Sequence, residues 1–98
     1  MKIVYNGNYS YFALSRKCIE RMAELGDESA KKELKLSGWY HNVRRNNPNL
    51  LQAISELGLR ECSGKTADLK INTIELSMGE YFIIQEYDGK EEVHIQCY

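Results

Sequence analysis

The amino-acid sequence predicts an α+β fold in which helices pack on one face of an antiparallel sheet. Three observations predict it: a short β-type stretch at the start, helix-period patterns with capping signals in the middle, and a hairpin pattern at the end. In chain order this is an N-terminal strand, two to three helices, and a three-stranded antiparallel meander that ends in a β-hairpin. Because 98 residues can bury one modest core, the chain is expected to be a single domain, residues 1–98.

The first strand is expected at residues 2–6, a run of β-favouring side chains that stops at the turn signal Asn6-Gly7-Asn8. A loop that holds three aromatic residues follows. They are Tyr9, Tyr11 and Phe12.

The expected helices each begin at a residue that caps helices well. Ser15 is the N-cap of the first helix, and Asp27 caps a weaker surface helix that runs to residue 36. Asn47 caps the third, with Pro48 at its first helical position, and this helix runs to Gly58. The apolar residues of the first helix fall on one face, at Cys18, Ile19, Met22, Ala23 and Leu25.

The last part of the chain has the pattern of antiparallel strands. Residues 69–76 alternate and then change phase, which predicts a strand with a bulge near Asn72-Thr73. Residues 81–87 and 93–97 flank Asp88-Gly89, the dipeptide preferred by a two-residue type I′ turn. The sequence therefore predicts a terminal hairpin.

The composition excludes several classes of function. Thirteen basic residues are balanced by fourteen acidic ones, and the net charge of −1 argues against general nucleic-acid binding. No segment resembles a signal peptide or a membrane helix. The three cysteines (Cys18, Cys62 and Cys97) fit neither a disulfide framework nor a zinc site, which favours free thiols in a reducing cytoplasm. We expect no metal and no cofactor.

No motif points to catalysis. Ser63-Gly64-Lys65-Thr66 looks like the end of a phosphate-binding P-loop, but five residues separate Gly58 from Gly64 where the motif requires four. The segment also follows a helix and enters a strand, the reverse of a P-loop. A cysteine near His41 or His94 would allow nucleophilic chemistry, yet no family-type context surrounds either cysteine candidate. We therefore expect a protein that is not an enzyme.

Two adjacent arginines, Arg44 and Arg45, lie just before the helix that Asn47 caps. Cations are disfavoured at the positive end of a helix dipole, so the pair suggests an anionic partner, either a ligand or a nearby carboxylate. Stacking surfaces for a nucleotide-like ligand would come from Tyr9, Tyr11 and Trp39. The alternative is that these aromatic residues pack the sheet while an arginine pairs with Glu56 or another carboxylate.

Several ordered segments together resemble a family of small, largely uncharacterised proteins of tailed bacteriophages and prophages. The segments are Lys2-Ile3-Val4-x-Asn6, Phe12-x-Leu14-Ser15, Arg45-x-Asn47-Pro48-x-Leu50-Leu51, Glu56-Leu57-Gly58, Ser63-Gly64, Ala67-x-Leu69-Lys70-Ile71 and Glu86-Tyr87-Asp88-Gly89-x-Glu91. The chain departs from the family at Tyr9-Ser10-Tyr11, where the relatives favour a glycine-rich loop, and at Asn47, where they favour aspartate.

The resemblance implies a virus-encoded accessory protein of the host bacterial cytoplasm. We expect it to counter bacterial immunity by binding and sequestering a small anionic ligand such as a nucleotide second messenger. Arg44, Arg45 and the helix at Asn47 would hold phosphate, and an aromatic side chain would stack on the base. The alternative is an inhibitor that blocks a host defence protein by direct contact, through the acidic hairpin around Asp88 and the helix at residues 27–36. A homo-oligomer is expected because sites in small proteins often form between protomers.

Overall fold

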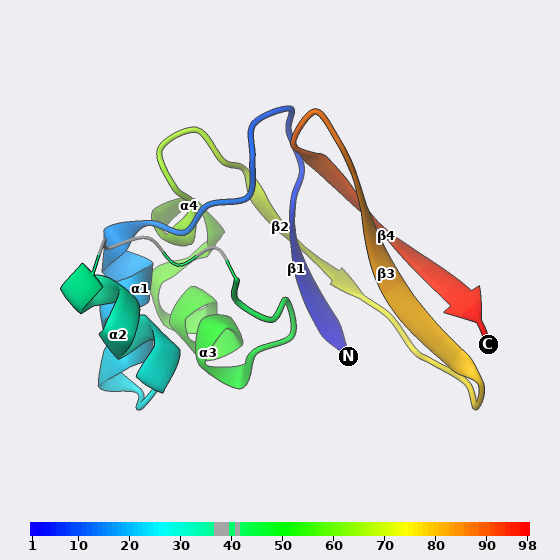
Figure 1. Cartoon of the computed structure of the whole chain (residues 1–98), viewed down its shortest axis with the longest axis horizontal. Helices are drawn as coiled ribbons and strands as arrows, with labels where there is room; N and C mark the ends of the chain where they lie inside the picture. Colours follow the sequence, from blue (N-terminus) through cyan, green and yellow to red (C-terminus); the bar gives the residue numbers. More distant parts are fainter. Residues whose placement is uncertain (37–39, 41) are drawn as a thin grey trace.

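The computed structural model describes residues 1–36, 40 and 42–98 and has an α+β architecture (Figure 1). Trp39 and His41, two residues that the sequence analysis singled out, lie outside the described residues. The elements in chain order are β1 (Lys2–Asn6), α1 (Arg16–Glu24), α2 (Glu28–Leu36), α3 (Pro48–Leu57), α4 (Leu59–Cys62), β2 (Leu69–Thr73), β3 (Glu80–Tyr87) and β4 (Lys90–Cys97).

The described strands form two antiparallel pairs, and the predicted three-stranded meander is not confirmed. β1 pairs with β2, so that Lys2 lies opposite Thr73, and β3 pairs with β4. A meander that joins β2 to the hairpin was expected because the three segments follow one another along the chain. In the structure β1 provides the edge with which β2 pairs, although the two strands are far apart in sequence.

The predicted bulge near Asn72-Thr73 is absent from the described strand, which runs in unbroken register to Thr73. The pairing continues in the same register one residue beyond the strand, at Ile74 and Met1. Ile74 exchanges two backbone hydrogen bonds with Met1, at 2.8 and 2.9 Å, and is itself buried.

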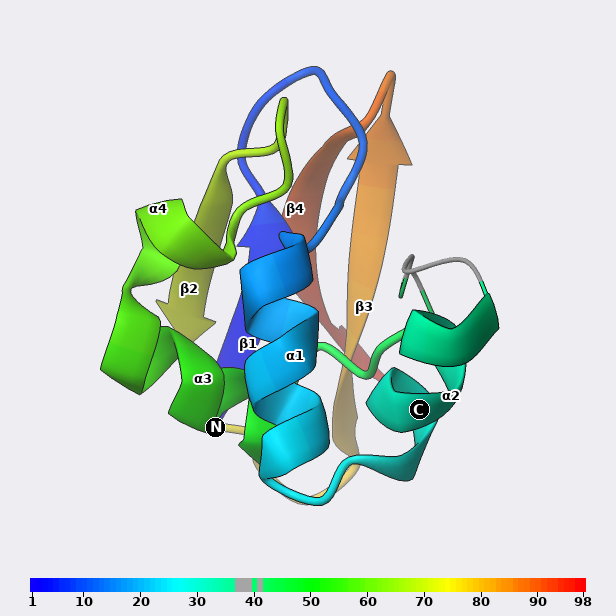
Figure 2. The same cartoon turned by 90° about the vertical axis from the view of Figure 1, so that its left-hand side faces the viewer.

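The helices cover one face of the β1–β2 pair, and the β3–β4 ribbon lies beside β1 on the side away from β2 (Figure 2). Val4 and Leu69 face the helices and join one apolar cluster with buried residues of α1 and α3. The helix residues of this core are Cys18, Ile19, Met22, Leu50, Ala53 and Ile54. The expected placement of helices on one sheet face therefore holds for the β1–β2 pair.

The predicted N-caps are confirmed. Ser15 Oγ accepts a hydrogen bond from the Cys18 N–H at 3.1 Å, and Asp27 Oδ1 accepts one from the Ala30 N–H at 2.9 Å. The helix α4, a single turn that begins directly after Gly58, was not expected from the sequence. Gly58 has φ 94°, so the backbone changes direction at this single residue. No polar linker separates α3 from α4, and the sequence therefore does not indicate that a second helix begins there.

The predicted hairpin is confirmed, with Asp88 and Gly89 at its turn. Their φ values of 50° and 91° are both positive, as a type I′ turn requires. No helix in the described part of the chain has the length and the apolar composition needed to cross a lipid bilayer.

Candidate binding site at the hairpin tip

Arg45 is held inside the molecule by Glu91. Its Nη1 and Nη2 atoms donate to the two carboxylate oxygens of Glu91 at 2.5 and 2.9 Å, and the side chains are only 18% and 7% exposed. The guanidinium also lies 3.6 Å from the ring centroid of Phe12. Arg44, in contrast, is exposed. The two arginines that were expected to hold a phosphate together are thus in different environments.

The start of α3 also faces a carboxylate of the chain. Asn47 Oδ1 accepts hydrogen bonds from the backbone N–H groups of Asn49 and Leu50, at 2.8 and 3.4 Å. Its Nδ2 donates to Asp27 Oδ2 at 3.0 Å. The sequence left open whether the anion near this basic segment is a ligand or a carboxylate. In the structure, carboxylates stand beside both Arg45 and the start of α3.

Glu56, which the sequence analysis named as a partner for Arg44 or Arg45, contacts a different arginine. Arg21 Nη2 lies 2.7 Å from Glu56 Oε1, and Gln52 donates to Oε2 at 3.0 Å. The hydrogen bond from Gln52, and then the contact with Arg21, lower the pKa of Glu56 below its usual value. This pair lies between α1 and α3, away from the hairpin.

Asn6, a fully buried residue at the end of β1, joins three other segments of the chain. Its side-chain amide donates to the carbonyl of Ser10 and, at 2.9 Å, to that of Gly89, and its backbone N–H donates to Glu91 Oε1 at 2.8 Å. Its Oδ1 accepts from the Asp68 N–H at 2.9 Å. We call Asn6, Arg45, Gly89 and Glu91 the polar junction, because together they attach the hairpin turn to β1 and to the loop after it.

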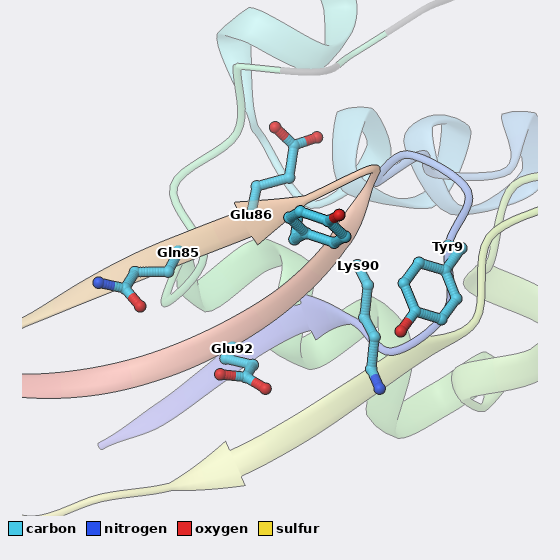
Figure 3. A pocket seen from close by; sticks show the side chains of 6 residues that line it. Tyr9, Gln85, Glu86, Lys90 and Glu92 are labelled. Atoms are coloured by element: carbon cyan, nitrogen blue, oxygen red, sulfur yellow. The ribbon is translucent and has the colours of Figure 1, made fainter.

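The polar junction creates an open groove at the hairpin tip. Because Asn6 holds both Ser10 and Gly89, the loop after β1 lies against the turn and brings Tyr9 next to the hairpin. The groove has a volume of about 560 Å³ (Figure 3). It is lined by Tyr9, Gln85, Glu86, Tyr87, Lys90 and Glu92, and we call it the tip groove.

The tip groove combines exposed aromatic rings with charged groups. Lys90 Nζ lies 5.3 Å from the ring centroid of Tyr9, and the two side chains lie side by side in Figure 3. Tyr9 and Tyr87 are 65% and 73% exposed. Glu92 Oε2 lies 3.1 Å from His94 Nε2. The groove therefore offers ring faces, one ammonium group and carboxylates.

Of the described residues that were expected to bind a ligand, Tyr9 lines this groove, whereas Tyr11, Arg44, Arg45 and Asn47 do not. Tyr11 belongs to the same loop and is 67% exposed, but it is not part of the lining. Arg45 and Asn47 are engaged in the contacts described above, Arg44 is exposed, and Trp39 lies outside the described residues.

The sequence analysis missed the hairpin residues of the groove, although a signal for them exists. A two-residue turn fixes the register, and this register places Tyr87 opposite Lys90 and Gln85 opposite Glu92. These four side chains must share one face of the ribbon. What the sequence does not indicate is that the loop with Tyr9 packs against that face.

Two of the cysteine thiols contact each other inside the core. Cys18 and Cys62 are both fully buried, and the hydrogen bond between their thiols, together with burial, raises the pKa of Cys18 far above its usual value. The same hydrogen bond lowers the pKa of Cys62. No group of three or more metal-ligating side chains occurs in the described ranges.

Comparisons with known proteins give no relative: no family model, no curated protein and no solved structure matches the chain.

Proposed function

We propose that this chain is a non-enzymatic binding protein that blocks another protein by direct contact, with the hairpin tip as its contact surface. The observation that carries the proposal is the gathering of three exposed tyrosines at this tip. Tyr9, Tyr11 and Tyr87 are each at least 65% exposed. Tyrosine is enriched at the centres of protein interfaces, because its ring offers a large contact area and its hydroxyl a hydrogen bond.

The rigidity of the tip supports the same proposal. The polar junction fixes both segments that carry these tyrosines, so little conformational entropy is lost when a partner binds. Exposed apolar and aromatic surface held in one conformation is typical of interaction sites.

The biological setting rests on the resemblance to bacteriophage proteins. We infer that the chain acts in the cytoplasm of a host bacterium as an accessory protein that counters a defence system, and that its target is a host defence protein.

Sequestration of a small anionic ligand such as a nucleotide second messenger is the second candidate. It is favoured by the position of Lys90 over the ring of Tyr9, since a base that stacks on the ring would bring its phosphate near the ammonium. The carboxylate of Glu92 in the same groove disfavours an anion, and Arg45 is paired with Glu91. For these reasons protein contact is the stronger candidate.

A pull-down from bacterial lysate with the immobilised chain tests the two candidates. The wild-type chain is expected to retain a protein in stoichiometric amount, and the double variant Tyr9→Ser/Tyr87→Ser is expected to lose it. Tyr98→Ser is the matched control, because Tyr98 is 92% exposed and lies at the other end of β4 from the tip.

The proposal fails if no protein is retained, or if Tyr98→Ser reduces retention as much as the double variant. Calorimetry with cyclic nucleotides and ADP-ribose derivatives at low salt then decides the second candidate. Heat of binding that disappears in Tyr9→Ser would favour sequestration, and silent injections would exclude it.

A further inference from the structure

We propose that the tip groove binds an arginine side chain from a basic segment of the partner protein. This inference rests on the proposed function and states which kind of side chain the partner protein presents. Three features of the molecule support it: the aromatic rings at the tip, the two unpaired carboxylates beside them, and an arginine site of similar composition within the fold.

The aromatic surface already attracts a cation of the chain itself. Lys90 Nζ lies within the distance at which a ring face attracts an ammonium group. The ring of Tyr9 and that of Tyr87 remain largely exposed, so each has free surface for a second cation. A planar guanidinium stacks on such a ring better than a compact ammonium does.

Two of the carboxylates around the turn, Glu86 and Asp88, have no partners of their own. In the described part of the chain, the side chains of Glu86 and Asp88 form neither an ion pair nor a hydrogen bond, and both residues are exposed. Figure 3 shows Glu86 on the other side of the ribbon from Lys90 and Glu92. Carboxylates thus flank the turn on both sides, and among the described residues that line the tip groove the one basic side chain, Lys90, is outnumbered by Glu86 and Glu92. A basic partner is therefore electrostatically complementary to the tip.

The polar junction is an internal example of the proposed contact. There the guanidinium of Arg45 stacks on Phe12 while Glu91 accepts two hydrogen bonds from it. The tip offers the same two components, an aromatic ring and a carboxylate, but both are open to solvent. An arginine of a partner can use Tyr9 or Tyr87 as the ring and a carboxylate of the turn as the acceptor.

The test measures binding of four labelled peptides by fluorescence anisotropy at low salt. Each peptide alternates glycine with one other residue, which is arginine, lysine, glutamine or glutamate. We expect the arginine peptide to bind best, the lysine peptide more weakly, and the other two not at all. Binding should weaken as salt is added, because the contact is partly electrostatic.

Variants of the tip identify the site. Glu86→Gln and Tyr9→Leu should each weaken binding of the arginine peptide by about threefold to tenfold, whereas Lys90→Gln should strengthen it, since the internal competitor for Tyr9 is removed. Glu24→Gln is the matched control, because it removes the same charge from an exposed position at the end of α1. It should leave the affinity unchanged.

Equal binding of the arginine and glutamine peptides would overturn the inference, as would a loss of affinity in Glu24→Gln equal to that in Glu86→Gln. Weaker binding by Lys90→Gln would overturn it as well. If the lysate partner still depends on Tyr9 and Tyr87 while the arginine peptide does not bind, the inference fails and the proposed function stands. If no lysate protein is retained, the proposed function fails independently of the peptides.

Discussion

Glu91 is a buried carboxylate that accepts hydrogen bonds from three donors, two on Arg45 and the backbone N–H of Asn6. Removal of a charge from water is costly, and only a close and well-oriented partner compensates for it. The described residues contain no buried side-chain polar atom without a hydrogen bond, so the junction is fully satisfied. Its residues therefore form a unit, and the loss of one affects the others.

Arg45→Met is expected to destabilise the protein by about 3–5 kcal/mol, because Glu91 is left as an uncompensated buried charge. Urea denaturation followed by circular dichroism measures the change. Arg44→Met is the matched control, since Arg44 is exposed, and it should change the free energy of unfolding by less than about 0.5 kcal/mol.

The double variant Arg45→Met/Glu91→Leu distinguishes the effect of the buried charge on stability from the effect of lost packing. It should be more stable than Arg45→Met alone, because no buried charge remains. If both single arginine variants have the same stability, or if the double variant is the least stable of all, the ion pair does not have the role described.

Several residues on which the expected resemblance to phage proteins rests have structural roles here. Asn6, Arg45, Gly89 and Glu91 form the junction, and Asn47 caps α3. A pattern made of such residues indicates a fold and not a ligand. The resemblance therefore does not mark out the tip groove, which includes only Glu86 and Tyr87 of these segments.

At the scale of elements, the hairpin turn is fixed both by its own sequence and by the loop it contacts. A Cβ atom added at Gly89 would collide with the carbonyl of Ser10, and Gly89 has φ 91°. Gly26, after α1, has φ 97° but no atom within 4 Å of such a Cβ. The two glycines therefore have similar backbone strain and different surroundings.

Gly89→Ala should destabilise the protein more than Gly26→Ala. Gly26→Ala, the control, is expected to lower the free energy of unfolding by about 1–2 kcal/mol, because alanine must adopt the left-handed conformation. Gly89→Ala adds the clash with Ser10, for about 1–3 kcal/mol more. Thermal and urea denaturation of both variants measure the difference. Equal losses would mean that the loop after β1 moves away from the turn without penalty.

Local elements of the fold could be predicted, and their pairing could not. The helices and the hairpin each have signals within a few residues, such as the cap at Asn47 and the turn at Asp88-Gly89. The pairing of β1 with β2 has no local signal, because the strands share only their apolar character. Chain order favoured a meander of neighbouring strands, and the structure differs from it for that reason.

The candidate site, too, could be predicted only in part. Tyr9 was expected from its type and its loop, and the face shared by Tyr87 and Lys90 follows from the turn. The partner of Arg45 could not be chosen, since Glu91 is one of fourteen acidic residues and lies 46 positions away. The pairing of Arg45 with Glu91 becomes evident only in the folded structure.

At the scale of the whole molecule, stability should fall at alkaline pH. Burial, as the main cause, raises the pKa of Tyr40 above its usual value near 10. As the pH rises, the unfolded chain loses the Tyr40 proton before the folded protein does. The contribution of Tyr40 to the free energy of unfolding is therefore fully present below pH 10 and is lost as the pH rises through the pKa of the folded state.

Tyr40→Phe tests this dependence. The free energy of unfolding of the wild type is expected to fall more steeply than that of the variant between pH 9 and pH 11, as measured by urea denaturation at each pH. Cys18, whose pKa is also raised, contributes equally to both proteins. If the free energy of unfolding of the two proteins falls in parallel with pH, Tyr40 is not the cause of the loss of stability.

Homo-oligomerisation stays a prediction. Within the described strands, β2 and β3 each pair along one edge only, and such edges are places where a second copy can add a strand.

The polar junction also determines when the chain can fold during its synthesis. Asn6 contacts Gly89 and Glu91, which lie 83 and 85 residues later. A ribosome adds about 5–20 residues per second, so β1 has none of these partners for several seconds after it emerges. Contacts of such long range also slow folding itself. During synthesis β1 can therefore pack on α1 and α3 before the hairpin exists, and its attachment to the hairpin is the last step of folding.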